Sequence, residues 1–400
     1  MMKRYIMTSN KSFYIYRTIL IVLCMIAMAA CGGGTPKNTN NNVQQNTIHT
    51  TAGLPLTPLV CPSDQSSGSS SAFVSSVGTE LAYQGSPLKL YGATFYPAPI
   101  GGSSAWRKPD FTRYIDHILY LEAQAGQNLI RPTDFWDQHY HDQAQEDATI
   151  WRNMDYLVCT ARQQGIFVIL DVSAFKWFLI SQKLDPYNAA NWETFLDAVG
   201  KHYSNQPSIA FYSISGEPAA PKSVDEMNKL VEFYRTVTDD LHRADGGHHL
   251  ITAGGLNHME DETQQIPWWQ QIYLLPNNNI LAFKTYSQND LNLLPTIAAF
   301  AKGINKPLVD EEFGLPQQMG DGETTGAVYN GLQTSRVQFY ENVYNLGEEN
   351  GVVGFVFWDL GCQLKDSSYQ VSPLTPALWR VIQEHAPNKP TTPSPAISAC

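Results

Sequence analysis

Apolar residues alternate between two kinds of segment from residue 88 to residue 386. Short apolar runs, of the length and composition typical of buried strands, are each followed by a longer segment with helical periodicity. The predicted strands span Leu88–Tyr96, Asn128–Pro132, Ile166–Val172, Ile209–Ile214, His249–Ala253, Ile280–Tyr286, Pro307–Asp310 and Val352–Trp358. The predicted helices span Phe111–Ala125, Ala148–Gln164, Trp192–Tyr203, Val224–His242, Leu291–Ala301, Val328–Leu346 and Pro376–His385, with a weaker pattern at Trp268–Leu275.

Eight strand-like runs, each followed by a helical segment, favour a single (β/α)8 TIM barrel. A doubly wound parallel sheet produces the same alternation and is the competing fold. Such a sheet would carry a Gly-rich phosphate loop after its first strand, whereas this chain reads Ala93-Thr-Phe-Tyr-Pro-Ala-Pro there. The absence of that loop and the count of eight units favour the barrel.

The first 30 residues have the pattern of a targeting segment. A basic stretch is followed by the apolar run Ile19–Met28 and by small residues before Cys31. This pattern resembles a bacterial lipoprotein signal, with Met28 at the position usually held by leucine, and the resemblance implies that Cys31 carries the lipid. An ordinary signal peptide and an uncleaved anchor are the alternatives. We therefore expect an extracytoplasmic protein, lipid-anchored to the cell membrane or secreted.

Composition changes at both ends of the periodic region. Residues 31–71 are rich in Thr, Asn, Gln, Ser, Gly and Pro, with few apolar residues to bury, and are predicted to form a disordered tether. Residues 72–386 form the predicted catalytic domain, and residues 387–400 form a Pro-rich tail.

The charge and aromatic content narrow the class of ligand. The formal net charge is −11, and it becomes −15 without residues 1–30, which contain four basic and no acidic residues. A nucleic-acid partner is excluded because binding it requires a basic patch. Aromatic residues make up 12% of the chain. Their faces suit stacking against sugar rings, although large cores also use aromatic residues.

Six cysteines are present; Cys24 lies in the targeting segment, and Cys31 is the residue expected to carry lipid. The other four allow three complete pairings, which the sequence leaves open. We expect Cys159 to be a plain core residue in a helix, while Cys61 and Cys400 flank the domain and are placed to close it. The spacing matches no metal signature, and no metal or cofactor is expected.

Charged and aromatic residues follow the predicted strands, at the barrel mouth where such folds place their chemistry. These residues are Phe95, Tyr96, Arg131, Asp134, Trp136, Asp171, Glu217, Asn257, His258, Lys284, Tyr286, Glu311, Glu312, Trp358 and Asp359.

Strands four and seven face each other, so Glu217 and Glu312 are expected in one cleft. Two such carboxylates are what a glycosidase needs. We expect Arg131 and a tyrosine to keep Glu312 ionised, and apolar neighbours together with a nearby negative charge to help Glu217 retain its proton. The plainer alternatives are a helix cap for Glu217 and a rim ion pair for Glu312.

Residues 88–386 resemble clan A glycoside hydrolases, most closely the family 5 cellulases and mannanases. Four segments carry the resemblance: Ile209-Ala-Phe-Tyr-Ser-Ile-Ser-Gly-Glu-Pro, Lys306-Pro-Leu-Val-Asp-Glu-Glu-Phe-Gly, Asn128-Leu-Ile-Arg131 and Gly354-Phe-Val-Phe-Trp358, together with Tyr286. The resemblance implies that Glu217 is the acid/base and Glu312, not Glu311, the nucleophile. It also implies that Arg131 and Tyr286 hold Glu312 and that Trp358 lies under the sugar.

Two positions depart from the family pattern. Gly216 stands where the family has an asparagine that bonds the sugar 2-hydroxyl, and Lys284 stands where the family has a histidine. Loss of one such contact costs on the order of 3 kcal/mol of transition-state stabilisation. The departures therefore place the rate or the type of substrate in question.

Two functions follow from these observations. The first is a retaining endo-β-glycosidase that cleaves β-1,4-linked mannan or glucan by double displacement. The second is a surface lipoprotein on a hydrolase scaffold that binds glycans without turning them over.

We expect substrate to be bound by Lys284, His258 and Trp136. Further candidates are Trp177, Trp268 and Trp269, with core packing as their alternative. We expect a monomer. The preferred sugar and internal or terminal cleavage are left open.

Overall fold

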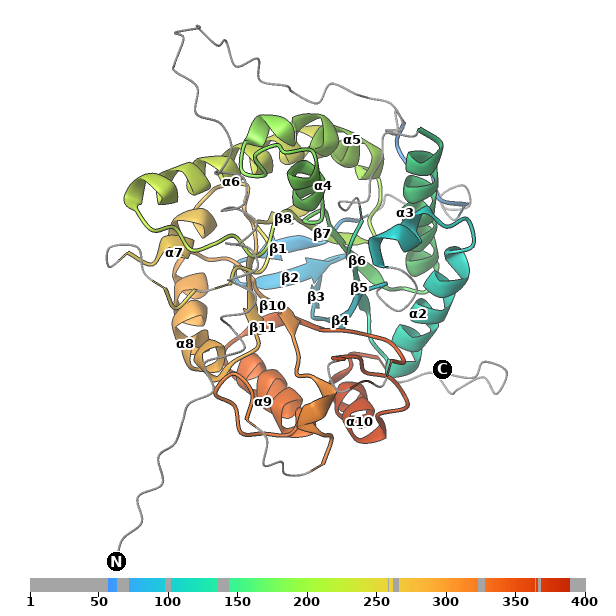
Figure 1. The fold of residues 1–400 in the computed structure, drawn as a ribbon, viewed down its shortest axis with the longest axis vertical. Coiled ribbons are helices and arrows are strands. Elements are labelled where there is room, and N and C mark those ends of the chain that lie inside the picture. Colours follow the sequence, from blue (N-terminus) through green and yellow to red (C-terminus); the bar gives the residue numbers. More distant parts are fainter. Residues whose placement is uncertain are drawn as a thin grey trace, which may run out of the picture. The chain divides into compact units, whose positions relative to one another are not determined.

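The protein is described by a computed structural model covering residues 57–62, 72–97, 102–135, 144–257, 259–261, 266–322, 328–363, 365 and 368–388. Eight parallel strands form one sheet that curls into a barrel, and helices surround it (Figure 1). The barrel strands are β4 (Leu90–Phe95), β5 (Leu129–Pro132), β6 (Phe167–Asp171), β7 (Ile209–Ser213), β8 (Leu250–Thr252), β9 (Leu281–Thr285), β10 (Leu308–Phe313) and β11 (Val352–Phe357). The predicted TIM barrel is confirmed.

The predicted helices follow the strands in the predicted order, and one further short helix, α4, was not predicted. They are α2 (Thr112–Ala125), α3 (Ala144–Gln163), α4 (Phe175–Ser181), α5 (Glu193–Tyr203), α6 (Val224–Asp245), α7 (Trp268–Tyr273), α8 (Gln288–Gly303), α9 (Arg336–Glu349) and α10 (Pro376–His385). The main error lies at α9, which was predicted to begin at Val328. It begins eight residues later because Ser335 and Gln338 form a capping box at its start.

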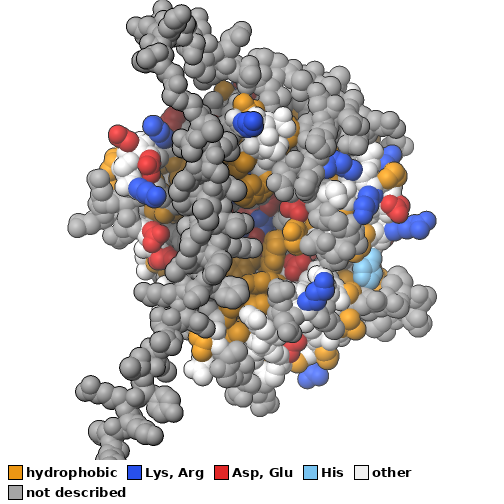
Figure 2. All heavy atoms as spheres, in the orientation of Figure 1, with side chains coloured by type: hydrophobic (Ala, Val, Ile, Leu, Met, Phe, Trp, Pro, Cys, Tyr) orange, Lys and Arg blue, Asp and Glu red, His pale blue; other side chains and the backbone are white. Residues whose placement is uncertain are grey.

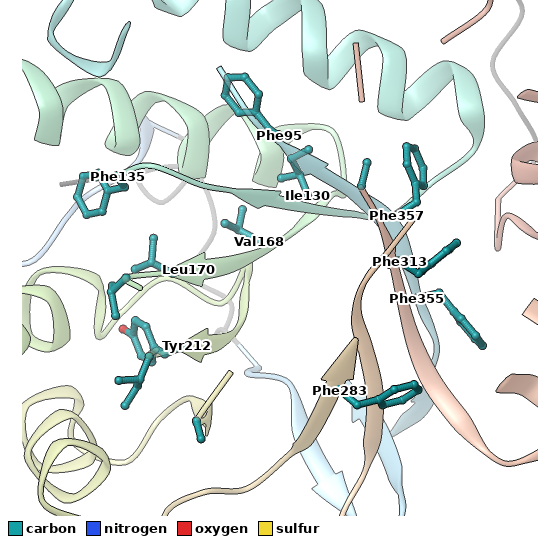
Figure 3. Packing of buried hydrophobic residues seen from close by; sticks show 14 of the residues in the cluster. Phe95, Ile130, Phe135, Val168, Leu170, Tyr212, Phe283, Phe313, Phe355 and Phe357 are labelled. Carbon is teal, nitrogen blue, oxygen red and sulfur yellow. The ribbon is translucent and has the colours of Figure 1, made fainter. Parts of the chain in front are cut away.

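Alternation of side chains along the strands separates an outer core from the barrel interior. Tyr91, Ala93 and Phe95 of β4 belong to the large apolar cluster between the strands and the helices, while Leu90 belongs to a smaller interior cluster. Several outward-facing aromatic side chains of this cluster are drawn in Figure 3. The same alternation directs polar residues near the strand ends toward the barrel axis.

A small antiparallel sheet that the sequence did not predict precedes the barrel. Its strands are β1 (Ser75–Val77), β2 (Glu80–Tyr83) and β3 (Ser86–Leu88), and they cross the middle of the ring in Figure 1. Leu81 and the neighbouring Val74 pack with interior residues of the barrel strands. The sheet thereby covers apolar side chains at the start of the strands, opposite the end where the polar residues gather.

The barrel is continuous except at one seam. Sheet order runs β8-β7-β6-β5-β4-β11-β10-β9, so β8 and β9 are its two edges. One isolated bridge, between Leu256 and Phe283, joins the two sides of the seam. Lys284 follows directly after this bridge.

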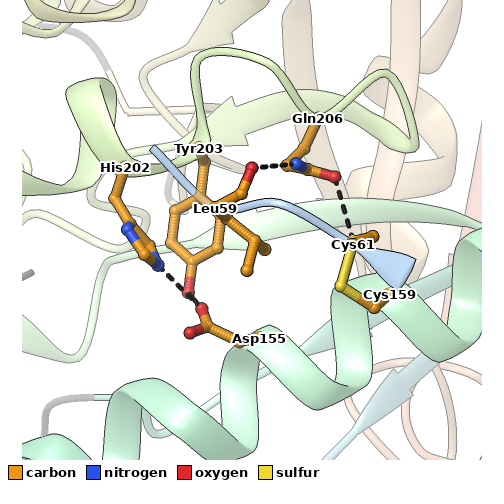
Figure 4. The surroundings of a disulfide bond; sticks show 7 residues. All are labelled: Leu59, Cys61, Asp155, Cys159, His202, Tyr203 and Gln206. Carbon is orange, nitrogen blue, oxygen red and sulfur yellow. Dashed lines mark hydrogen bonds and ion pairs between the residues drawn. A yellow bond between two sulfur atoms is a disulfide. The ribbon is translucent and has the colours of Figure 1, made fainter. Parts of the chain in front are cut away.

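A disulfide joins Cys61 to Cys159 of α3, at a sequence separation of 98 (Figure 4). The expectation that Cys159 is an unpaired core residue is therefore wrong. The extended segment around Leu59 explains the error, because its backbone bonds to His202 and Gln206 and brings Cys61 against α3. Cys362 is disulfide-bonded as well.

Charged side chains stand mostly at the periphery of the face shown in Figure 2, and hydrophobic side chains gather nearer its middle. None of the helices among the described residues is long and apolar enough to cross a membrane. The predicted signal at residues 1–30 with Cys31 and almost all of the tether lie outside the described residues, as does most of the tail.

Candidate active site

Arg131 and Asp171 reach the barrel interior because each lies an even number of residues after an interior apolar residue, Leu129 on β5 and Ile169 on β6. The Arg131 Nη2 atom lies 2.6 Å from Asp171 Oδ2, and its Nη1 atom donates to Glu312 Oε2 at 2.7 Å. Both side chains are almost fully buried. A guanidinium at the centre of the barrel thus joins the carboxylates of two strands.

Two consecutive glutamates face the interior because β10 carries an irregularity. Asp310 pairs with Phe283 and Glu312 with Lys284, so Glu311 has no partner residue on β9. Glu311 is fully buried, accepts a hydrogen bond from the Gly255 backbone N–H and lies 3.6 Å from Arg131 Nε. Burial raises the pKa of its carboxyl group. Glu311 therefore lies beneath the site, with its carboxylate turned to the backbone, and Glu312 lines the cleft.

Glu312 is held by three donors. Arg131 Nη1 and Lys284 Nζ donate to its Oε2 at 2.7 and 2.9 Å, and the Tyr286 hydroxyl donates to its Oε1 at 2.7 Å. Burial alone would raise the pKa of Glu312, but the charges of Lys284 and Arg131 outweigh it and lower the pKa to about 2. An ionised carboxylate fixed by three donors is suited to act as a nucleophile.

Glu217 lies four residues beyond the end of β7, with backbone φ of +63°, a left-handed conformation that costs a residue other than glycine about 1–2 kcal/mol. Its side chain is 45% exposed and accepts a hydrogen bond from Lys284 Nζ at 2.9 Å. Glu217 does not cap the following helix, because the Ser223 hydroxyl accepts a hydrogen bond from the N–H of Glu226 at the start of α6. The unusual backbone directs the carboxylate into the cleft.

The ammonium of Lys284 bridges the two glutamates. Its Nζ atom lies 2.9 Å from Glu217 Oε1 and 2.9 Å from Glu312 Oε2, so these two oxygens are no farther apart than twice 2.9 Å. The charge of Lys284 is the main cause that lowers the pKa of Glu217. The expected negative charge beside Glu217 is present, because Glu312 raises the pKa of Glu217. The expectation that Glu217 retains its proton is nevertheless wrong, because the charge of Lys284 outweighs this effect. The sequence named Lys284 as a substrate-binding residue, but it contacts carboxylates.

Aromatic residues border the cleft. Trp358 follows β11 and stacks at a tilt on Tyr96, with ring centroids 5.2 Å apart. Trp177 of α4 is 46% exposed and also lines the cleft. Trp268 and Trp269 are buried in the core, which excludes them as sugar-binding surfaces. Trp136 and His258 lie outside the described residues.

Position 216 is closed to a side chain. A Cβ atom on Gly216 would meet the carbonyl oxygen of Gly255 at 2.9 Å, closer than such atoms approach in proteins. The Lys176 ammonium donates to the Gly216 carbonyl oxygen at 2.9 Å. Sequence analysis missed Lys176 because it lies in the short helix α4. The signal available was its place in Phe175-Lys176-Trp177, just after the strand that ends at Asp171.

These residues enclose a cleft of about 240 Å³. It is lined by Arg131, Thr133, Asp134, Asp171, Ser173, Ala174, Lys176, Trp177, Gly216, Glu217, Lys284, Glu312 and Trp358. Across the described ranges, no group of three or more His, Cys, Asp or Glu side chains is arranged to hold a metal ion. The groups that line the cleft include carboxylates, ammonium groups, a guanidinium, hydroxyl groups and aromatic faces.

Comparison with known proteins agrees with this architecture. The family model described as cellulase (glycosyl hydrolase family 5) matches residues 88–362. Among solved structures, the endo-β-1,4-mannanase from Thermotoga petrophila is 15% identical, with a TM-score of 0.57 over 75% of this chain and 76% of that one. The endo-1,4-β-mannanase from Rhizomucor miehei is 15% identical, with a TM-score of 0.58 over 78% and 98%. No curated protein matches the sequence.

Proposed function

Because this chain belongs to glycosyl hydrolase family 5, we propose that it is a retaining endo-β-glycosidase acting on β-1,4-linked mannan or glucan. Glu312 is proposed as the nucleophile and Glu217 as the acid/base. The family membership supports a glycoside hydrolase, and the mannanases among the structural neighbours support a β-linked polysaccharide as substrate.

In the first step, the Glu312 carboxylate attacks the anomeric carbon while the bond to the leaving sugar breaks. The leaving oxygen takes the proton of Glu217. In the second step, the Glu217 carboxylate takes a proton from water, whose oxygen attacks the anomeric carbon and releases Glu312. Two inversions give net retention. Arg131 and Tyr286 keep Glu312 ionised, and Trp358 supports the sugar ring.

One observation carries this proposal: a single ammonium, Lys284 Nζ, contacts both glutamates. The two carboxylates therefore border the same space at a short separation. Retaining glycosidases have carboxyl groups about 5–5.5 Å apart, whereas inverting enzymes need roughly 6.5–9.5 Å to admit a water molecule.

The proposal is tested by incubating the protein with mannan, glucomannan and carboxymethyl-cellulose and measuring the release of reducing ends. We expect activity on at least one polymer and a loss of roughly 10³-fold or more in Glu312→Ala. Adding azide as an external nucleophile then distinguishes the nucleophile from the acid/base. In Glu217→Ala it should restore turnover with a β-glycosyl azide product, and in Glu312→Ala with an α-glycosyl azide. Identical products from the two variants would refute the assignment.

A second candidate function is glycan binding without turnover. Its support is the same Lys284 contact, because an ion-paired Glu217 with a lowered pKa lacks the proton that a leaving group requires. Binding of mannan or glucan by the wild-type protein without release of reducing ends, at any pH between 3 and 8, would favour this alternative.

A further inference from the structure

Lys176 is a buried ammonium group that the proposed reaction does not use. Its side chain extends from α4 to the cleft, and the residue is 8% exposed. Nζ donates one hydrogen bond, to the Gly216 carbonyl oxygen at 2.9 Å. Among the described residues no carboxylate lies within ion-pairing distance of it. Burial lowers the pKa of this ammonium group.

The other two cations of the cleft, Arg131 and Lys284, form ion pairs with carboxylates at N–O distances of 2.6–2.9 Å. An ammonium group has three N–H donors, and Lys176 uses one of them. Lys284 donates to two carboxylates and keeps one donor. Lys176 keeps two, and of the three cations it is the one whose donors no described carboxylate engages. A buried donor without an acceptor is costly, and a bound sugar hydroxyl would remove that cost.

The place of this ammonium beside position 216 is fixed by the surrounding backbone. Gly216 presents no side chain, and the Gly255 carbonyl fills the space where one would begin. Lys176 of α4 therefore supplies a donor at the place where residue 216 offers no side chain. Glu217 follows Gly216 directly, so a ligand at Lys176 lies next to both proposed catalytic carboxylates.

We propose that Lys176 binds the hydroxyl on C2 of the sugar ring held over Glu312, and that it thereby sets the preference between β-mannosyl and β-glucosyl units. The two units differ only at C2, where the hydroxyl is axial in mannose and equatorial in glucose. The Lys176 ammonium is fixed by its hydrogen bond to the Gly216 carbonyl oxygen. It therefore favours a C2 hydroxyl in one of these two orientations, axial or equatorial. This inference rests on the proposed function for the position of the sugar.

Binding is measured in a Glu312→Gln background, where turnover does not interfere, by calorimetric titration with mannotetraose and cellotetraose. We expect the two dissociation constants to differ by roughly tenfold or more, because hydrogen bonds to charged groups contribute this much. Adding Lys176→Met should bring their ratio close to one. Lys176→Gln, which keeps a donor for Gly216, should retain part of the difference.

Lys229→Met is the matched control, because Lys229 is exposed on α6, and it should leave both dissociation constants unchanged. Equal weakening of both tetraoses by Lys176→Met would show a purely structural role and overturn the inference. So would a parent protein that binds the two tetraoses equally, or not at all. Failure of hydrolysis in the wild-type protein, with discrimination intact in the Glu312→Gln background, would refute only the proposed reaction.

Discussion

At the scale of single residues, Lys284 decides how the two glutamates share protons. It contacts both, and its charge lowers the pKa of Glu217 and of Glu312. A glycosidase needs one ionised and one protonated carboxyl group. With both pKa values lowered, that combination exists only at acidic pH.

We therefore expect the wild-type pH profile of kcat/KM to lie on the acid side, with activity falling as pH rises through the pKa of Glu217. Lys284→Gln removes the main cause that lowers this pKa and leaves burial and the charge of Glu312, which both raise it. The alkaline limb should move to higher pH. Measurement of kcat/KM between pH 3 and 8 checks this, with Lys229→Gln as the unaffected control, and an unmoved limb would contradict it.

Sequence reasoning identified individual residues where a motif fixed the strand and the position within it. Arg131, Glu217, Tyr286 and Glu312 were named, and the structure brings them to one cleft. The ionisation of Glu217 was predicted wrongly because it depends on Lys284, 67 residues away. Which charges meet across a barrel depends on side-chain rotamers that no local pattern records.

At the scale of elements, the disulfide between Cys61 and α3 holds the segment before the barrel in place. A crosslink across a sequence separation of 98 restricts the unfolded chain strongly, and removal of a native disulfide typically costs about 2–5 kcal/mol. We expect Cys61→Ala/Cys159→Ala to unfold at lower denaturant concentration and to keep its activity at 25 °C, since neither residue borders the cleft.

Equilibrium urea unfolding of the double variant and of the wild type measures this difference. Reduction of the wild-type protein with dithiothreitol should lower its stability in the same direction, although Cys362 is also disulfide-bonded. Equal stability of the double variant and the wild type would show that the bond adds nothing to the folded barrel.

Elements were predictable where one periodicity extended over the whole segment. The bounds of α10 match the prediction, and each barrel strand was found within a few residues. The β1–β3 sheet was missed because its strands have three or four residues and little apolar alternation. The short helix α4 was missed for the same reason of length, and Lys176 with it.

At the scale of the whole molecule, the barrel was predictable from the count of eight alternating units. Its seam between β8 and β9 was not, because hydrogen bonding between particular strands depends on twist and closure rather than on composition. The signal at residues 1–30 with Cys31 lies outside the described residues and stays a prediction from sequence alone. We propose that Cys31 carries a lipid that tethers the barrel to the outside of the cell membrane.

The tether is tested by expressing the full chain in a bacterium that processes lipoproteins and separating its membrane and soluble fractions. The wild-type protein should be found with the membranes and become labelled by a fatty acid. Cys31→Ser should remove the label and release the barrel, with unchanged activity on soluble substrate. Labelling that persists in Cys31→Ser would rule out this cysteine as the lipid-bearing residue.

The contact between Gly216 and the Gly255 carbonyl also has an evolutionary consequence. A mutation that places asparagine at position 216 must displace a backbone carbonyl that a Cβ atom would meet at 2.9 Å. Such a substitution requires a change in the segment around Gly255 as well, so its effect depends on the order in which mutations arise. Under selection for a different sugar, single substitutions in α4 are therefore more accessible than a substitution at position 216.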